Sequence, residues 1–179
     1  MKHLALLRGI NVSGHKMIKM DALKKALEAI GFTNVSTYIQ SGNVFLDSEE
    51  KSAAKVGFLI KQEIFKTFGH DVPIIMITKE DLQACLDRND FLNEPDIDLK
   101  KLYVSFISSE LPENMITQLN LNYIKPDKIQ LDGKRIYLKY DISPAKTRLD
   151  NKWIEKNMNV ISTTRNWNTV NKLLELFTE

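Results

Sequence analysis

The sequence predicts an α+β protein with a ferredoxin-like βαββαβ N-terminal half, a second, incomplete ferredoxin-like half, and C-terminal helices. Three observations lead to this fold class. Apolar residues alternate at strand spacing in some segments and recur at helical spacing in others. The 179 residues fit one ordinary domain or two small subdomains. The small number of glycines and prolines, 7 and 5, argues against long disordered segments. We expect subdomains at residues 1–79 and 101–179, joined by a helix and an acidic linker at 80–100.

In the N-terminal half, the apolar pattern predicts four strands and two helices. Residues 3–8 are apolar on both faces, which is typical of a central strand. Residues 35–39 and 44–46 are rich in β-forming side chains and flank a tight turn at 40–43. The remaining elements are helices over 20–30 and 56–68 and a strand over 72–77, where Pro73 near the start fits a sheet edge.

The second half repeats part of this order. Residues 101–108 are predicted to form a strand, and Pro112 suits the first turn of the helix that follows. The stretch KIQLDGKRIYLKY is predicted to be a hairpin, because its Asp-Gly turn is flanked by alternating apolar residues. Two helices, around 149–157 and 165–177, end the chain. This β-α-β-β-α order is a ferredoxin-like half that lacks its last strand.

The βαββαβ order has a consequence for where the loops lie. In this topology the first and second strands run parallel, and the third strand is inserted between them in the antiparallel direction. The loop that leaves the first strand and the hairpin that joins the next two strands therefore lie at the same end of the sheet. We expect residues 8–19 and 40–43 to form one surface.

The first of these bends, with the sequence RGINVSGHKMIKM, has the composition of an anion-binding loop. It contains Arg8, Lys19 and one further lysine but no acidic residue. Gly9 and Gly14 have the spacing of the glycines in a phosphate-binding P-loop, but the lysine comes one place late and no magnesium-binding hydroxyl follows it. A true P-loop is therefore not predicted. Glycine-rich amides and lysines near a helix start still favour an anion, although an ordinary solvent-exposed loop can have the same composition.

Polar side chains can complete such a site. Asn11, Gln40, Ser41 and Asn43 can hydrogen-bond a ligand, but asparagine and serine at turns more often bond their own backbone. Arg165 is predicted in the first turn of the last helix, where a cation opposes the helix dipole. A carboxylate or phosphate ligand would neutralise it, as would solvent or an acid elsewhere in the fold. We expect Arg165 to join the site only if the last helix places its N-terminus there.

The distribution of charge along the chain would also allow a nucleic acid or another protein as the partner. The net charge of +2 provides no overall polycation for binding nucleic acid. The charges are nevertheless separated along the chain: residues 1–20 carry four cations and no acid, and residues 143–172 carry six cations and two acids. Residues 79–100 carry three cations and seven acids. Solvated helix faces and an acidic linker would give the same pattern.

The sequence contains no recognisable catalytic or metal-binding pattern. His3, His15 and His70 are scattered rather than set at metal-ligand spacing, and the neighbours of Cys85 do not suggest an activated thiolate. A single cysteine allows no internal disulfide. No apolar run approaches membrane-spanning length, and the N-terminus has no secretory signal pattern. We expect a cytoplasmic protein.

Three stretches, RGINVSGHKMIKM, TYIQSGNVFL and TTRNWNTVNKLLEL, occur in this order and together resemble the signature of domain-of-unknown-function family 1697, an uncharacterised bacterial family. The resemblance covers nearly the whole chain. It implies an α+β fold with ferredoxin-like parts and implies no activity. The chain differs from the family pattern at Ser13, usually glycine, and at Lys16, usually a smaller polar residue. The residues at motif positions are Arg8, Gly9, Asn11, Gly14, Lys19, Gln40, Ser41, Gly42, Asn43, Thr164, Arg165, Asn166 and Trp167.

The leading hypothesis is a protein that binds a small phosphate- or carboxylate-bearing ligand, such as a nucleotide, at the sheet end formed by residues 8–19 and 40–43. No reaction, cofactor, metal or oligomeric state is indicated, so whether the protein is an enzyme stays open. The alternatives are a nucleic-acid-binding module that uses the basic chain ends and a protein-interaction module that uses the acidic segment 80–98. The predicted ligand-binding residues are Arg8, Gly9, Asn11, Gly14, Lys19, Gln40, Ser41, Asn43 and Arg165.

Overall fold

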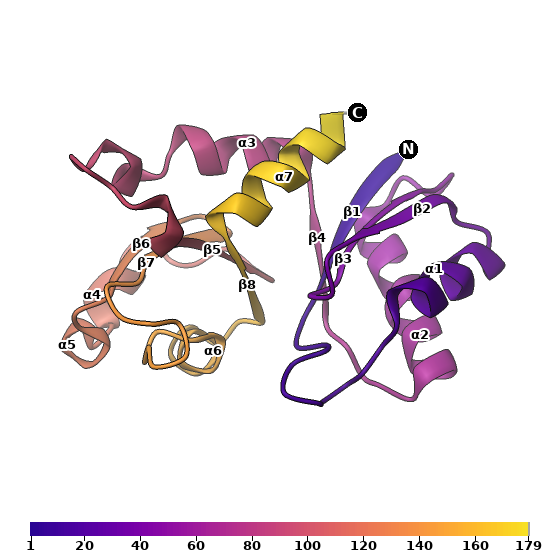
Figure 1. Cartoon of the computed structure of the whole chain (residues 1–179), viewed down its shortest axis with the longest axis horizontal. Helices are drawn as coiled ribbons and strands as arrows, with labels where there is room; N and C mark the ends of the chain where they lie inside the picture. The colour runs from indigo at the N-terminus through magenta and orange to yellow at the C-terminus, as the bar shows by residue number, and fades with distance from the viewer. Residues whose placement is uncertain (179) are drawn as a thin grey trace. The chain divides into compact units, whose positions relative to one another are not determined.

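The computed structural model describes residues 1–178 and divides the chain into two compact units. The first unit is Met1–Lys79 together with the chain from Phe177 onward, and the second is Glu80–Leu176. Each unit contains one four-stranded antiparallel sheet (Figure 1). The α+β fold class predicted from the sequence is confirmed.

The first unit has the predicted βαββαβ order. Its strand order is β2-β3-β1-β4, so β3 lies between β1 and β2, and β4 forms an edge directly after Pro73. The elements are β1 (Lys2–Leu7), α1 (Met20–Ala29), β2 (Thr33–Tyr38), β3 (Asn43–Asp47), α2 (Ala53–Phe68) and β4 (Ile74–Ile77).

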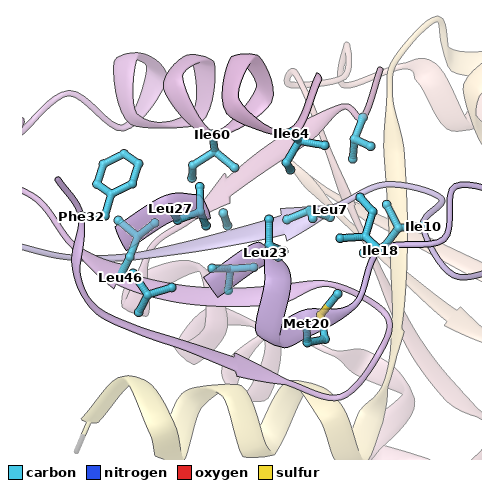
Figure 2. Close-up of a cluster of buried hydrophobic side chains, with 14 of the residues drawn as sticks. Leu7, Ile10, Ile18, Met20, Leu23, Leu27, Phe32, Leu46, Ile60 and Ile64 are labelled. Atoms are coloured by element: carbon cyan, nitrogen blue, oxygen red, sulfur yellow. The ribbon is translucent and has the colours of Figure 1, made fainter. Parts of the chain in front are cut away.

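The core of the first unit lies between its sheet and the helices α1 and α2 (Figure 2). Leu23 and Leu27 of α1 and Ile60 of α2 are fully buried against strand residues such as Leu7 and Leu46. Leu4 and Leu6 of β1 point to the other face and are also fully buried. Burial on both faces is what the apolar run at residues 3–8 predicted.

The second unit is a complete ferredoxin-like half, which corrects the prediction that it lacks its last strand. Its strand order, β6-β7-β5-β8, repeats the order of the first unit. The elements are α3 (Lys79–Asp87), β5 (Leu102–Ile107), α4 (Met115–Gln118), α5 (Leu121–Ile124), β6 (Lys128–Asp132), β7 (Arg135–Lys139), α6 (Asn151–Met158), β8 (Ser162–Asn166) and α7 (Trp167–Thr178), with 3-10 helices at Asp90–Asn93 and Leu99–Lys101.

The unpredicted strand β8 explains the error. Its sequence is STTRN, and it pairs with β5 so that Arg165 lies opposite Val104 and Thr164 opposite Ser105. A strand of polar residues has no apolar alternation to reveal it. The prediction that the last helix begins at Arg165 is therefore wrong: α7 begins at Trp167, and the Asn166 Oδ1 accepts a 2.8 Å hydrogen bond from the Thr169 amide at its start.

Helices cover both faces of the second sheet (Figure 1). The face toward α6 carries an apolar core that includes Ile136, Leu138 and Ile154. On the other side, α3 is fixed to the sheet by polar contacts: the Tyr137 hydroxyl donates to the Ala84 carbonyl at 3.1 Å, and Arg135 lies 2.9 Å from an Asp81 carboxylate oxygen.

Candidate functional site

The two bends predicted to meet do lie at the same end of the first sheet. The Asn11 Nδ2 donates a 2.9 Å hydrogen bond to the Gln40 carbonyl, and the Leu7 amide donates a 2.8 Å bond to the Gly42 carbonyl. These bonds join the bend at residues 8–19 to the hairpin at 40–43. We call this surface the rim.

The bend at residues 8–19 is fixed by its own side chains. Ile10 and Ile18 are 1% and 2% exposed and insert into the core beside Leu7 (Figure 2). The Asn11 Oδ1 accepts from the Ile18 amide at 2.8 Å, and its Nδ2 donates to the Ile18 carbonyl at 2.9 Å as well as to Gln40. The Lys16 ammonium donates to the Asp71 carbonyl. A chain segment with little regular structure is thereby held in one shape.

The hairpin is fixed in a similar way. Asn43 is fully buried, and its Nδ2 donates to the Tyr38 carbonyl at 2.8 Å and to the Ser41 hydroxyl at 3.3 Å. Gly42 has a φ of +83°, and a Cβ there would lie 2.7 Å from the Leu7 Cβ and 2.8 Å from the Ile10 Cδ1. Only glycine allows this close approach of the hairpin to the bend.

Of the two roles weighed for the asparagines, the structure supports bonding to backbone. All the hydrogen bonds described for the Asn11 side chain go to main-chain atoms, and its φ is +53°, a left-handed value that asparagine tolerates better than most residues. Asn11 and Asn43 therefore position the rim. Gly9 and Gly14, with φ of +71° and +77°, give the bend its reversals of direction.

Cationic and polar side chains remain on the rim's surface. Arg8 is partly exposed, while Lys19 and Gln40 are exposed. Lys19 occupies the N-cap position of α1, and its side chain makes no capping hydrogen bond. Asp71, the acid beside Lys16, is paired with Lys61 at 2.9 Å, and the hydrogen bond from Lys61, more than the charge of Lys16, lowers the pKa of its carboxyl. The rim has the charge and the donors to hold an anion.

Arg165 belongs to the second unit and lies within β8 rather than in a helix. Its side chain is 6% exposed, and its Nη1 donates to the Thr163 hydroxyl at 2.8 Å and to the Thr164 carbonyl at 3.0 Å. Burial lowers the pKa of the guanidinium to about 10. The hypothesis that an anion neutralises Arg165 because a cation in the first turn of a helix opposes the helix dipole therefore no longer applies, since Arg165 lies in a strand.

The second unit contains a cavity that was not singled out from the sequence. It has a volume of about 600 Å³ and is lined by residues 120, 123, 147, 148, 150, 152, 153, 156 and 157. Three cations, Arg148, Lys152 and Lys156, line it together with the aromatic rings of Tyr123 and Trp153. The excess of cations in residues 143–172 was the available signal, but nothing in the sequence brings Tyr123 to them.

In the part of the chain that the structure describes, nothing supports a metal site, an activated cysteine or a membrane-spanning helix. Residues 1–178 contain no group of three or more His, Cys, Asp or Glu side chains that could hold a metal ion. Cys85 is buried, and burial raises the pKa of its thiol to about 12, the opposite of an activated nucleophile. None of the described helices has both the length and the apolar character to cross a membrane.

Comparison with known proteins gives a family and a fold. Residues 1–137 match the model of a family described as protein of unknown function (DUF1697). A solved structure described as the conserved bacterial protein SP0830 from Streptococcus pneumoniae is similar to the chain, with a TM-score of 0.71 and 24% sequence identity over 99% of this chain and 98% of that one. No curated protein sequence matches.

Proposed function

This chain belongs to the DUF1697 family of proteins of unknown function, and on that premise we propose that it binds a small phosphate- or carboxylate-bearing ligand, such as a nucleotide, at the rim. In this proposal Arg8 and Lys19 supply charge, and Gln40 and Ser41 contact a polar part of the ligand. The amides of the segment from Gly9 to Gly14 orient the anion. The single cysteine supports a cytoplasmic setting as part of the same proposal.

The observation that carries the proposal is the hydrogen bond from Asn11 Nδ2 to the Gln40 carbonyl. It brings a bend that carries cations and no acid against a hairpin with exposed polar side chains. Because the bend is fixed before a ligand arrives, little conformational entropy is lost on binding. A loop whose only task is to connect β1 to α1 needs neither three bonds to one asparagine side chain nor repeated left-handed residues.

The acidic segment 80–98 gives less support to the protein-interaction alternative. Asp81 is bonded to Arg135, and Glu94 is bonded to Lys139 and lies 3.6 Å from Lys128. The hydrogen bond from Lys139 lowers the pKa of Glu94. These acids stabilise the second unit itself, and their charge is partly neutralised there.

Equilibrium binding of a nucleotide panel tests the proposal. We expect Arg8→Ala to raise the Kd of the best ligand by about ten- to a hundredfold, because a charge-assisted hydrogen bond contributes roughly 1.5–3 kcal/mol. Lys19→Ala should also weaken binding, and its fold should be intact because the Lys19 side chain makes no cap bond.

The matched control is Lys25→Ala, which removes an exposed lysine from α1 outside the rim. Its Kd should equal that of the wild type. The proposal is rejected if no nucleotide or small carboxylate binds, or if Arg8→Ala and Lys19→Ala bind as tightly as Lys25→Ala does.

A further inference from the structure

The cavity of the second unit has the chemistry of a second ligand site, independent of the rim. We propose that it binds a nucleotide unit, an aromatic base joined to a phosphate, supplied either as a free mononucleotide or as part of a single-stranded nucleic acid. Its volume of about 600 Å³ lies within the range of roughly 300–1,000 Å³ that is usual for small-molecule sites. The proposal depends on the charge of the cavity, on its aromatic rings and on the hydrogen bonds that hold the loop at residues 141–149.

The charge of the cavity favours a phosphate. Among the described residues, no acid forms an ion pair with Arg148, Lys152 or Lys156. Asp150 is the one acid in the lining, and its Oδ1 accepts a 2.8 Å hydrogen bond from the Trp153 amide as the N-cap of α6. Three cations against one acid leave a net positive site, and a guanidinium can bond two phosphate oxygens at once.

The rings of the cavity suit a base. Tyr123 is 47% exposed, and the Arg148 Cζ lies 5.3 Å from the centroid of its ring, a cation–π arrangement. Trp153 is partly buried against the apolar core, so its ring is held in place by packing. Bases stack on such rings and on guanidinium planes in single-stranded nucleic-acid sites.

A buried carboxylate, that of Asp127, holds the loop at residues 141–149, which contributes Thr147 and Arg148 to the lining of the cavity. The Asp127 Oδ1 accepts from the Asp141 amide at 2.7 Å and from the Ile142 amide at 3.2 Å, and its Oδ2 accepts from the Thr147 hydroxyl. The Tyr140 hydroxyl donates to the Leu149 carbonyl at 2.9 Å. These bonds fix the backbone on both sides of Arg148. A preformed site of this kind binds without first ordering its loop.

The test uses the indole N–H signals of the full-length protein in a ¹⁵N-correlated NMR titration. The chain has 2 tryptophans, Trp153 in the cavity lining and Trp167 buried elsewhere in the fold, and Trp153→Phe assigns the signals. Adenosine 5′-monophosphate should shift the Trp153 signal and leave that of Trp167 in place. Adenosine and inorganic phosphate, added separately, should bind more weakly than the nucleotide.

Single substitutions separate this site from a general effect of charge. Arg148→Gln and Lys152→Gln should each raise the Kd for the nucleotide about tenfold. Lys134→Gln, which removes an exposed lysine at the β6–β7 turn outside the lining, should not change it. Asp150→Asn keeps an N-cap oxygen but removes the repulsive charge, so we expect binding to tighten by about two- to fivefold.

Two outcomes overturn the proposal: no shift of the Trp153 signal at millimolar nucleotide, or an equal loss of affinity in Lys134→Gln and Arg148→Gln. Equal affinity for adenosine and for the nucleotide also overturns it, because the cations would then have no part in binding. A five-nucleotide single-stranded RNA distinguishes the sources of the ligand: tighter binding than the mononucleotide identifies a strand, and equal binding a free nucleotide. Arg8→Ala should leave the shift unchanged, which separates this site from the rim.

Discussion

Asn11 shows how one side chain can determine the geometry of the rim. Its amide group bonds both backbone groups of Ile18 and the carbonyl of Gln40, so it links a bend to a hairpin about 30 residues away in the sequence. The residue sits where the chain must adopt a left-handed φ. Both requirements are met by asparagine, whose short amide side chain also tolerates that backbone conformation.

Replacement of Asn11 by alanine should therefore destabilise the protein. Three lost hydrogen bonds and the strain of alanine at a left-handed φ predict a fall of about 2–3 kcal/mol in the free energy of unfolding. Urea denaturation measures it. Gln40→Ala is the matched control, because the bond from Asn11 goes to the Gln40 backbone, and it should change stability by less than about 0.5 kcal/mol. Equal stability of the two variants would show that the asparagine does not hold the rim.

Cys85 should give the protein a measurable sensitivity to alkaline pH. Burial raises the pKa of its thiol from 9.0 in the unfolded chain to about 12. The unfolded state therefore loses this proton before the folded state does. The stabilising contribution of the neutral thiol is complete below pH 9 and is lost as the pH rises from 9 toward about 12.

We expect the free energy of unfolding to fall more steeply over this interval in the wild type than in Cys85→Ala, as measured by urea denaturation at a series of pH values. Burial also raises the pKa of Tyr137 and Tyr140. The contribution of Tyr140 is shared by both proteins, whereas the charge of the Cys85 thiolate adds to the raised pKa of Tyr137, so the difference in slope reports the thiol together with its coupling to Tyr137. A thiol reagent should modify Cys85 only after unfolding. Parallel slopes, or rapid modification of the folded protein, would contradict the assignment.

At the scale of elements, irregular segments are held by polar side chains where helices and strands are absent. Asp127 holds the loop at 141–149 by hydrogen bonds, as Asn11 holds the bend at 8–19. Asp127 is 3% exposed and accepts from two amides and one hydroxyl of that loop. Removal of such an acceptor leaves its donors without a protein partner in a partly buried place, which costs stability.

Asp127→Ala should accordingly release this loop. Because the loop contains Lys146 and Arg148, we expect trypsin to cleave there many times faster than in the wild type, with the new ends identified by mass spectrometry. Asp141→Ala is the control, since the Asp141 carboxylate makes a partly exposed 3.3 Å ion pair with Lys101, a contact that contributes little. Cleavage at equal rates in both variants would show that Asp127 does not fix the loop.

The elements also show which parts of the structure were visible in the sequence. The four strands and two helices of the first unit follow from apolar spacing, and the position of the rim follows from their order. The strand β8 could not be predicted, because it presents Ser162, Thr163 and Arg165 to buried surroundings where apolar residues are the usual signal. The sequence could not show whether Asn11 binds a ligand or its own backbone, since the side-chain amide can form hydrogen bonds with either.

At the scale of the whole molecule, the same strand order occurs twice. The orders β2-β3-β1-β4 and β6-β7-β5-β8 are equivalent, although the two halves show no residue-level repeat. Topology constrains which positions face a core but leaves the choice of apolar residue open. The sequences of loops are constrained even less. This freedom allows one unit to carry its cationic surface on a bend after its first strand and the other to carry a cationic cavity beside α6.

The two cores should respond separately to damage. Leu27 belongs to the core of the first unit and Ile154 to that of the second, and both are fully buried. Truncation of either to alanine should cost about 2–5 kcal/mol, because it removes buried surface and leaves a cavity. Since each core draws its residues from its own unit, the loss should appear first in the unit that is mutated.

Hydrogen exchange followed by mass spectrometry measures this directly. In Leu27→Ala we expect faster exchange at the amides of β1 and β3 with little change in β5 and β7, and in Ile154→Ala the reverse. Faster exchange in both sheets from either substitution would mean that the units unfold as one cooperative body. In that case a substitution at the rim could alter the cavity through global stability alone, and ligand affinities at the two proposed sites would have to be compared between variants of equal stability.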